Sequence, residues 1–342
     1  MTTDIRDIAR HLGLSVSTVS KALNGYGSVS EKTRARILQA AQEFHYSPSR
    51  AARSLRNNRT EKIGLVLYTS TPLSSRSSEY YFEIIRGAAT AAEGRGYNLI
   101  LYLTVGSQRE RLIQLCRSRE VDCLILMVGT GTVSEPVEVL LAEELPFIVL
   151  NKHPQLPGAS YIVSEHEAGA FQAVEHLIGL GHRRIAYLGR DDDLETSGDR
   201  YAGYRRALEA HGIAPDETLV ALASSQPQGA YHAMEGLLEL ADRPTAVFAY
   251  SDAWAIGALR AINDSGLSVP DDLSLVGFDD LRAASLTHPP LTTVRQQLAE
   301  LGRRAIEALL IQVEQGDDPS PVDQAVPVDL VVRQSTARPR SA

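Results

Sequence analysis

Cysteine, long apolar runs and a signal-like N-terminus are nearly or wholly missing from this 342-residue chain. Its two cysteines, Cys116 and Cys123, lie in or beside apolar sequence, which suits buried thiols better than a disulfide or metal framework. No apolar run approaches the roughly 18 residues of a membrane span. The opening MTTDIRDIARHLG contains no apolar core of a secretory signal. We therefore expect a folded cytoplasmic protein with no membrane partner.

Catalytic and cofactor motifs are equally scarce. The GTG at residues 129–131 is not followed by the third glycine of a dinucleotide fingerprint, and no phosphate-binding lysine loop exists. The nine histidines are scattered without metal-ligand spacing. No Ser, His and Asp set can be nominated without geometry. The sequence predicts no enzyme, no metal site and no cofactor.

Acidic residues outnumber basic ones, and the net charge is −8, but the charge is uneven. Residues 1–60 contain ten Lys or Arg and four Asp or Glu, so they carry +6 while the rest of the chain carries −14. A basic N-terminal segment on an acidic body is typical of a nucleic-acid-binding head. A solvated basic surface without a function would show the same balance.

The basic segment contains three short helical patterns. Apolar residues recur at helical spacing from Ile5 to Leu12, which predicts a first helix that Gly13 ends. Ser15 caps a second helix in SVSTVSKALNG, whose buried stripe begins at Val19. The two helices are about three residues apart, the spacing of a helix-turn-helix.

A third helix is predicted in SVSEKTRARILQAAQEFHY, capped by Ser28 or Ser30, with Ile37, Ala41 and Phe44 on its apolar face. Three short helices around one small core are typical of a DNA-binding head whose second helix enters the major groove. A generic three-helix packing unit would have the same spacing. We place this head at residues 1–46.

The exposed face of the second helix is short and rich in hydroxyls. Small side chains let a recognition helix approach base edges and phosphates closely. Val16 is suited to a thymine methyl, Ser17 to a base edge, and Lys21 to a guanine or a phosphate. These three residues are the first candidates for DNA contact.

Residues 47–60 are predicted to form a hinge. Pro48 suits the first position of a helix of fewer than ten residues, which is too short to be stable alone in water. Ala52 and Leu55 would share one face of it, flanked by arginines such as Arg56. An apolar wedge between arginines suits the DNA minor groove. A plain interdomain linker is the alternative.

The segment from Thr3 to Leu55 closely resembles the head and hinge of lactose/galactose-repressor (LacI-type) transcriptional regulators, nearly without gaps. The resemblance implies that the second helix chooses the operator sequence through the three residues named above. It also implies that Leu55 wedges into the central base step of the operator from a DNA-ordered hinge helix. The positions that it assigns mostly to phosphates are Thr18, Ser20 and Asn24.

From residue 61 to 342, apolar strand-like runs alternate with helical stretches. KIGLVLY, YNLILYLT, CLILMV and FIVLN form one series, and RIAYLG, LVALAS, AVFAYS and LSLVGFDD form a second. Such alternation predicts parallel sheets covered on both faces, and two series predict two similar subdomains. The expected fold class is an all-α head plus an α/β body. Ligands of such sheets bind at the carboxyl ends of strands.

Motifs of the body are similar, in order and spacing, to the effector domain of the same family, which is built like a periplasmic sugar-binding protein. They are HLIGLGHRRIAYLG, SGDRYAGYRRAL, AVFAYSDAWAIGALRAINDSGLSVPDDLSLVGFDD and PPLTTVRQ. The resemblance implies that Arg200 and Asp279 bind the effector and places further pocket groups at Asn151 and Ser251. A structural ion pair or loop cap is the alternative for Arg200 and Asp279.

The chain departs from the family at the segment after the first strand, TSTPLSSRSSEYYFEII, which is longer than usual, so no contacts are carried over from Leu73 to Phe82. Asn151 and Ser251 replace Asp and Asn of relatives, which alters the expected hydroxyl pattern. For Trp254, the only Trp, we expect a packing role; a position at the pocket edge or at the dimer interface is the alternative.

The resemblance implies a ligand-responsive repressor of carbohydrate-metabolism genes that binds a palindromic operator as a homodimer, associated with the nucleoid. Its expected partners are double-stranded DNA and a sugar effector. A purine or a phosphorylated metabolite acting as corepressor is the alternative effector. A solute-binding protein would share the body but carry a signal peptide and no basic head, and a Rossmann-like enzyme would share only the strand and helix alternation.

The expectation of a dimer rests on two observations. The helix starting near Asp252 and the segment after Asp280 match dimer-forming regions of the family. The tail TARPRSA has no leucine heptads that would build a tetramer.

Overall fold

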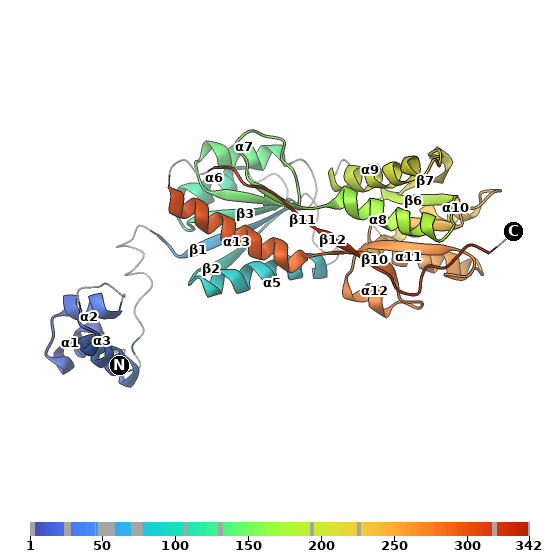
Figure 1. The fold of residues 1–342 in the computed structure, drawn as a ribbon. Coiled ribbons are helices and arrows are strands. Elements are labelled where there is room, and N and C mark those ends of the chain that lie inside the picture. Colours follow the sequence, from blue (N-terminus) through green and yellow to red (C-terminus); the bar gives the residue numbers. More distant parts are fainter. Residues whose placement is uncertain are drawn as a thin grey trace. The chain divides into compact units, whose positions relative to one another are not determined.

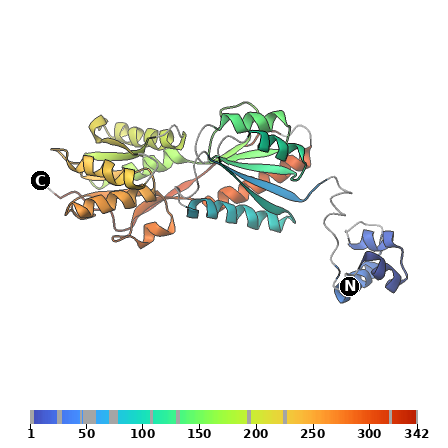
Figure 2. The same cartoon turned by 180° about the vertical axis from the view of Figure 1, so that it is seen from behind.

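The computed structural model describes residues 4–23, 29–44, 46, 59–69, 78–105, 109–128, 133–191, 195–223, 227–316 and 320–340. The chain divides into two compact units, Met1–Glu61 and Lys62–Ala342 (Figures 1 and 2). Within these described residues, the first unit is helical and the second contains two six-stranded sheets. The predicted fold class is confirmed.

The described part of the head contains three helices, α1 (Ile5–Leu12), α2 (Val16–Leu23) and α3 (Glu31–Glu43). Gly13 ends α1 in the left-handed conformation, with φ 66°, which glycine adopts without steric cost. Ser30 caps α3 by accepting a hydrogen bond from Thr33 N. One apolar core joins the helices, built from Ile8, Ala9, Val19, Ala22, Ile37, Ala40 and Ala41.

The first sheet of the body, sheet A, has the strand order β11-β5-β4-β3-β1-β2, and all of its neighbouring strands are parallel. Its strands are β1 (Lys62–Thr69), β2 (Asn98–Val105), β3 (Cys123–Val128), β4 (Phe147–Leu150), β5 (Tyr161–Ser164) and β11 (Asp323–Val326). Helices cover both faces, which is why β3 and β4 are continuously buried. One face packs on α5 (Ser78–Gly94) and α13 (Leu298–Gln315), the other on α6 (Arg109–Arg117) and α7 (Ser134–Ala142).

The second sheet, sheet B, has the order β12-β10-β9-β8-β6-β7. Its strands are β6 (Ile185–Arg190), β7 (Val220–Ala223), β8 (Ala246–Ala249), β9 (Ser274–Asp279), β10 (Thr292–Gln296) and β12 (Val328–Val331). One face packs on α8 (His166–Gly179) and α9 (Glu195–Ala210), and the other packs on α10 (Pro227–Leu238) and α11 (Asp252–Asp264). A short helix, α12 (Arg282–Leu286), follows β9, and a 3₁₀ turn, η2 (Glu217–Leu219), precedes β7. The expectation of parallel sheets is wrong at one edge, because β12 runs antiparallel to β10.

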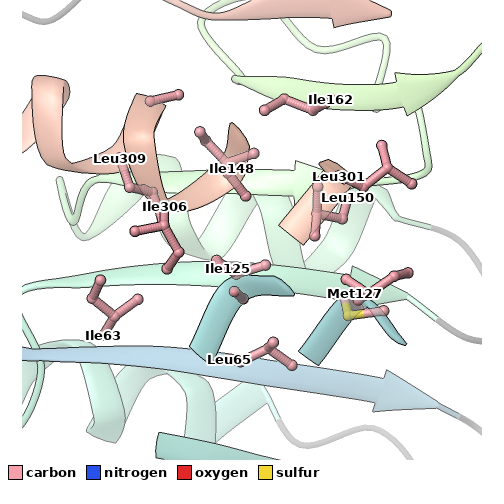
Figure 3. Packing of buried hydrophobic residues seen from close by; sticks show 14 of the residues in the cluster. Ile63, Leu65, Ile125, Met127, Ile148, Leu150, Ile162, Leu301, Ile306 and Leu309 are labelled. Carbon is pink, nitrogen blue, oxygen red and sulfur yellow. The ribbon is translucent and has the colours of Figure 1, made fainter. Parts of the chain in front are cut away.

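The chain passes between the two sheets three times. It leaves sheet A after β5, returns after β10 into α13, and passes back between β11 and β12. Figure 3 shows the core that this return creates, in which Leu301, Ile306 and Leu309 of α13 pack on the side chains of sheet A. Because β5 and β10 end where the chain changes sheets, their last residues lie near both subdomains.

Both cysteines are buried free thiols, in agreement with the sequence analysis. Among the helices of the described part of the chain, none is long and apolar enough to cross a membrane.

Candidate functional site

Helix α2 presents a small polar face. Val16, with 42% of its surface exposed, Ser17 and Lys21 are exposed, whereas Thr18 and Ser20 are half-buried. The stripe opposite them packs into the head core. This face can therefore approach a flat or grooved partner without displacing core residues.

Ser15 begins α2 as the sequence predicts. Its Oγ accepts a hydrogen bond from Thr18 N at 3.1 Å and lies 2.8 Å from Thr18 Oγ1. A capping hydroxyl satisfies an orphan N–H of the first turn and keeps the N-terminal end of the helix formed. The other predicted DNA contacts, Asn24 and the hinge residues Ala52, Leu55 and Arg56, lie outside the described residues.

The body contains a second candidate site, where strands of both sheets end. Five buried polar side chains meet there, each between 3% and 9% exposed. Asn151 follows β4, His166 begins α8, Arg200 lies in α9, Asp279 ends β9 and Gln296 ends β10. We call these five residues the polar ring. Asn151, Asp279 and Gln296 lie at the carboxyl ends of parallel strands, where this class of sheet binds ligands.

The hydrogen bonds of the polar ring form a closed cycle. Asn151 Oδ1 lies 3.1 Å from His166 Nε2, and His166 Nδ1 lies 3.4 Å from Arg200 Nη2. Arg200 Nη2 and Gln296 Nε2 both donate to Asp279 Oδ1, at 3.3 and 2.7 Å. Asn151 Nδ2 completes the cycle by donating to Gln296 Oε1 at 3.4 Å. The cycle links Asn151 of sheet A with Arg200 and Asp279 on the sheet B side.

Two residues of the ring adopt backbone conformations that are uncommon outside glycine. Asn151 has φ 57° and Asp279 has φ 114°. Asn and Asp tolerate positive φ better than most residues, but the conformation is still costly, and such strain concentrates at functional sites. At both positions it turns the chain sharply at the end of a strand and brings the side chain into the ring.

Arg200 packs against two aromatic rings. Its guanidinium carbon lies 3.8 Å from the centre of the Phe278 ring and 4.6 Å from that of Tyr250, and its Nη1 donates to the carbonyl of Tyr250 at 2.5 Å. Within the described residues, Arg200 Nε is buried and has no hydrogen-bond partner. An unpaired buried donor is costly, so this edge of the guanidinium is suited to a bound acceptor.

The ring's electrostatics follow from burial. Burial alone would lower the pKa of Arg200, but the nearby Asp279 carboxylate raises it above its ordinary value. Burial raises the pKa of Asp279, and Arg200 opposes that rise. Burial, and then the charge of Arg200, hold the pKa of His166 well below its ordinary 6.5. The ring at neutral pH therefore consists of one ion pair, a neutral imidazole and two amides.

His166, Gln296 and Tyr80 are not among the residues predicted from the sequence. Tyr80 of α5 accepts a hydrogen bond from Asn151 Nδ2, and burial raises its pKa above the ordinary value. Gln296 ends a strand, so the rule that ligand groups follow strands would have found it once PPLTTVRQ is assigned as β10. Tyr80 has no such signal, because it lies on a helix.

The remaining predicted residues have clear structural roles. Ser251 is buried, and its Oγ caps α11 by accepting from Trp254 N at 3.4 Å. It is not bonded to the polar ring, although it follows Tyr250, whose carbonyl accepts from Arg200. Trp254 packs against Tyr250 and donates from Nε1 to Gly189 O at 3.2 Å, which is a packing role. No group of three or more His, Cys, Asp or Glu side chains in the described residues could hold a metal ion.

A helix-turn-helix head attached to a two-sheet body with a buried polar ring at the strand ends defines a class: ligand-responsive DNA-binding regulators. Comparison with known proteins supports this class. Residues 4–49 match the model of bacterial regulatory proteins of the lacI family, and residues 174–336 match a periplasmic binding protein-like domain.

Curated relatives match along nearly the whole chain. The HTH-type transcriptional repressor PurR of Mannheimia succiniciproducens is 32% identical over 98% of this chain and 98% of its own length. The HTH-type transcriptional regulator AscG of Escherichia coli is 34% identical over 92% of this chain and 93% of its own. The chain belongs to the lacI family. It is a DNA-binding transcriptional repressor that responds to a small-molecule effector, and not an enzyme.

Solved structures agree with this assignment. The lac repressor dimer bound to operator and the anti-inducer ONPF is 29% identical, with a TM-score of 0.81, and the match covers 98% of this chain and 100% of its own. The complex of the regulator CelR with cellobiose is 31% identical, with a TM-score of 0.74, and covers 97% of this chain and 99% of its own.

Proposed function

We propose that this repressor controls carbohydrate-metabolism genes in the cytoplasm, at the nucleoid, and that its effector is a sugar. The observation that carries the proposal is the charge balance of the polar ring. Its single cation, Arg200, is paired with Asp279 at 3.3 Å, and its other members are uncharged amides and a neutral imidazole. Such a set can donate to and accept from the hydroxyls of a neutral ligand.

An anionic ligand fits this balance less well. A phosphorylated metabolite would need a cation in the ring that is not already neutralised, because a buried unpaired charge is costly. The structure solved for CelR holds cellobiose, and that of a regulator from Enterococcus faecium holds ribose, both uncharged sugars. A purine acting as corepressor is the competing effector and is included in the test below.

Within the effector site, we assign Asp279 to accept from sugar hydroxyls and Arg200 to donate to them. Asn151 supplies an amide from the sheet A side, and Ser251 a hydroxyl beside Tyr250. The ion pair between Arg200 and Asp279 that sequence analysis offers as an alternative is present, and it is compatible with ligand binding because Arg200 Nε has no partner among the described residues.

The head is proposed to read DNA as the family resemblance implies. Exposure of Val16, Ser17 and Lys21 on α2 supports their contact with base edges. Thr18, Ser20 and Asn24 are assigned to phosphates, and Ala52, Leu55 and Arg56 to a hinge helix that DNA orders. The proposed domains are residues 1–46, 47–60 and 61–342.

A homodimer is proposed to bind a palindromic operator, one head on each half-site. Exposed apolar side chains support a pairing surface on the body. Leu286, on α12 after Asp280, is 71% exposed, and Leu101 and Leu103 are exposed on the edge strand β2. Large exposed apolar side chains are compatible with burial against a partner.

The experiment that tests this function is selection of bound duplexes from a random DNA pool by the full-length protein, followed by sequencing. A recovered palindrome supplies the operator for a displacement assay with cellobiose, ribose, a phosphorylated sugar and purine bases. Operator binding that changes only with neutral sugars supports the proposal. Recovery of no consensus with or without the panel, or a response to purines or phosphorylated sugars alone, would count against it.

A further inference from the structure

His166 occupies the point of the polar ring where the chain leaves sheet A. It is the first residue of α8, directly after the crossing that follows β5, and it is 3% exposed. One ring nitrogen faces Asn151 on the sheet A side and the other faces Arg200 in α9 on the sheet B side. The imidazole is therefore the group that joins Asn151 to Arg200, while Gln296 joins Asn151 to Asp279 on the other side of the cycle.

The hydrogen-bond partners of His166 determine which of its ring nitrogens carries the proton. Asn151 Oδ1 already accepts from the backbone N–H of Ser164 at 3.0 Å, so this atom is the oxygen of the amide and His166 Nε2 must donate to it. Arg200 has only donors, so His166 Nδ1 must accept from it. Only the neutral tautomer protonated at Nε2 satisfies both bonds.

We propose that His166 is a positioning residue of the effector site, whose Nε2-protonated imidazole holds Arg200 and Asn151 in the orientation that binds the effector and couples binding to the angle between the subdomains. This proposal rests on the proposed function and deepens it. Arg200 supports it directly: two aromatic rings pack against its guanidinium and its Nη2 is bonded to His166 and Asp279. Its buried Nε–H, which has no hydrogen-bond partner among the described residues, is left for a ligand acceptor.

The charges around the imidazole favour the neutral form. Arg200 is the nearest, and Asp279, which would otherwise favour a protonated imidazole, is already paired with Arg200. Farther out, Asp252 of α11 and Tyr80 of α5 act on the ring through Asp279 and Asn151. A second proton on His166 would direct an N–H at an N–H of Arg200 and open the cycle.

The first measurement is made on the unmodified protein and needs neither DNA nor sugar. Long-range ¹H–¹⁵N NMR of the histidine rings reports which nitrogen carries the proton. We expect one histidine to be neutral with Nε2 protonated at neutral and at mildly acid pH, and to be missing from the spectrum of His166→Gln. Assignment of the Nδ1-protonated or the doubly protonated form to His166 would overturn the proposal.

The second measurement compares variants in sugar-dependent operator binding. His166→Phe fills the space without either polar atom and should weaken the response to the active sugar by roughly 10- to 100-fold, the range for lost hydrogen bonds to charged groups. His166→Gln offers one donor and one acceptor and should restore most of it. His176→Gln, on the same helix but bonded to Thr336, is the matched control and should respond like wild type.

A merely structural role would lower the melting temperature of His166→Phe and leave the sugar response of its folded fraction unchanged, and that result would overturn the proposal. An equal loss in His166→Gln and His166→Phe would also overturn it, because ring shape and not hydrogen-bond polarity would then be required. If the wild-type protein answers to none of the sugars, the proposed effector class fails. If the wild-type protein responds to a sugar and His166→Phe responds equally, the proposed role of His166 is wrong while the proposed effector class stands.

Discussion

Asp252 shows how one buried side chain stabilises three segments near the candidate effector site. It is the first residue of α11 and 1% exposed. Its Oδ2 accepts from Leu281 N at 2.8 Å, and its Oδ1 accepts from Thr293 Oγ1 at 2.5 Å. These bonds join α11 to the turn after β9 and to β10, the two strands whose ends supply Asp279 and Gln296.

Replacing Asp252 by Ala should lower the free energy of unfolding by about 1–3 kcal/mol, because the two donors are left buried without an acceptor. Asp252→Asn should cost less, since its amide oxygen can accept from Leu281 N while its NH₂ donates to the Thr293 hydroxyl. Denaturant unfolding of the three proteins measures the difference. Equal losses in both variants would show that the hydrogen bonds are not what Asp252 contributes.

The dependence of this effect on pH gives a second readout. Burial, and then the charge of Asp279, raise the pKa of Asp252 well above the ordinary 3.8. The folded state then binds this proton more tightly than the unfolded chain, so the stabilisation is complete below pH 3.8 and is lost as the pH rises through the folded pKa. Asp252→Asn has no such proton. Its stability relative to wild type should therefore rise with pH across that window.

At the scale of residues, the sequence predicts those members of the polar ring that match effector-binding positions of the family. Arg200, Asp279 and Asn151 are found in this way, and the structure joins them, while their role in binding stays a prediction. His166 is not predicted from the sequence, because the strand before it, Tyr161–Ser164, has only four residues and no strong apolar pattern of its own. The closed cycle of hydrogen bonds is not predicted either, because it depends on which strand ends the sheet topology brings together.

At the scale of elements, α5 and α13 show a close contact between backbones. A Cβ built on Gly302 of α13 would lie 2.1 Å from the carbonyl oxygen of Ile84 in α5, and one built on Gly87 of α5 would lie 1.9 Å from Ala299 O. Glycine at both positions lets the two helices approach where larger residues would separate them. Figure 1 shows the two helices side by side on one face of sheet A.

Gly302→Ala should therefore destabilise the body by about 1–3 kcal/mol, the usual cost of overpacking, despite the better helix propensity of Ala. Gly236→Ala in α10 is the matched control, because nothing lies within 4 Å of its Cβ position. That variant should be unchanged or more stable by about 0.5–1 kcal/mol. Thermal unfolding of both variants measures the contrast. A Gly302→Ala protein as stable as the control would mean that the helices separate at little cost.

Helix α2 is the element that the head is proposed to place in the major groove. Lys21 is exposed on it, so Lys21→Ala should leave the melting temperature of the head unchanged and weaken operator binding. If Lys21 contacts a phosphate, binding should fall evenly across operator variants and the salt slope should drop by about 1. If it contacts a guanine, specificity should relax at one position instead. Val19→Ala, in the head core, should weaken binding only through loss of folding.

Element order is predictable from this sequence only as far as its periodic runs extend. The two series of strands predict β1–β4 and β6–β9 and the two sheets that they build. The return of α13 and β11 to sheet A is not predicted, because nothing local distinguishes a helix that stays with its subdomain from one that crosses. The antiparallel edge strand β12 is missed for a related reason: it has four residues and follows another strand after a single residue.

At the scale of the whole molecule, the head and the body differ in net charge and each has its own apolar core. The N-terminal 60 residues carry +6 and the remaining chain −14, and the head has an apolar core of its own. An acidic body repels DNA, so attraction to phosphates is expected from the head alone. The body begins with β1, whose Ile63 and Leu65 are fully buried in the core of sheet A.

Deletion of residues 1–59 should therefore abolish DNA binding and leave sugar binding intact. The cut lies before Lys62, where β1 begins between β2 and β3, so all six strands of sheet A are kept. Titration calorimetry with the sugar found active on the full-length protein measures the retained affinity, and a gel-shift assay at low salt measures residual DNA binding. If sugar affinity and DNA binding were lost together while the deletion protein stayed folded, head and body would not be separate modules. The effector would then be bound by residues from both.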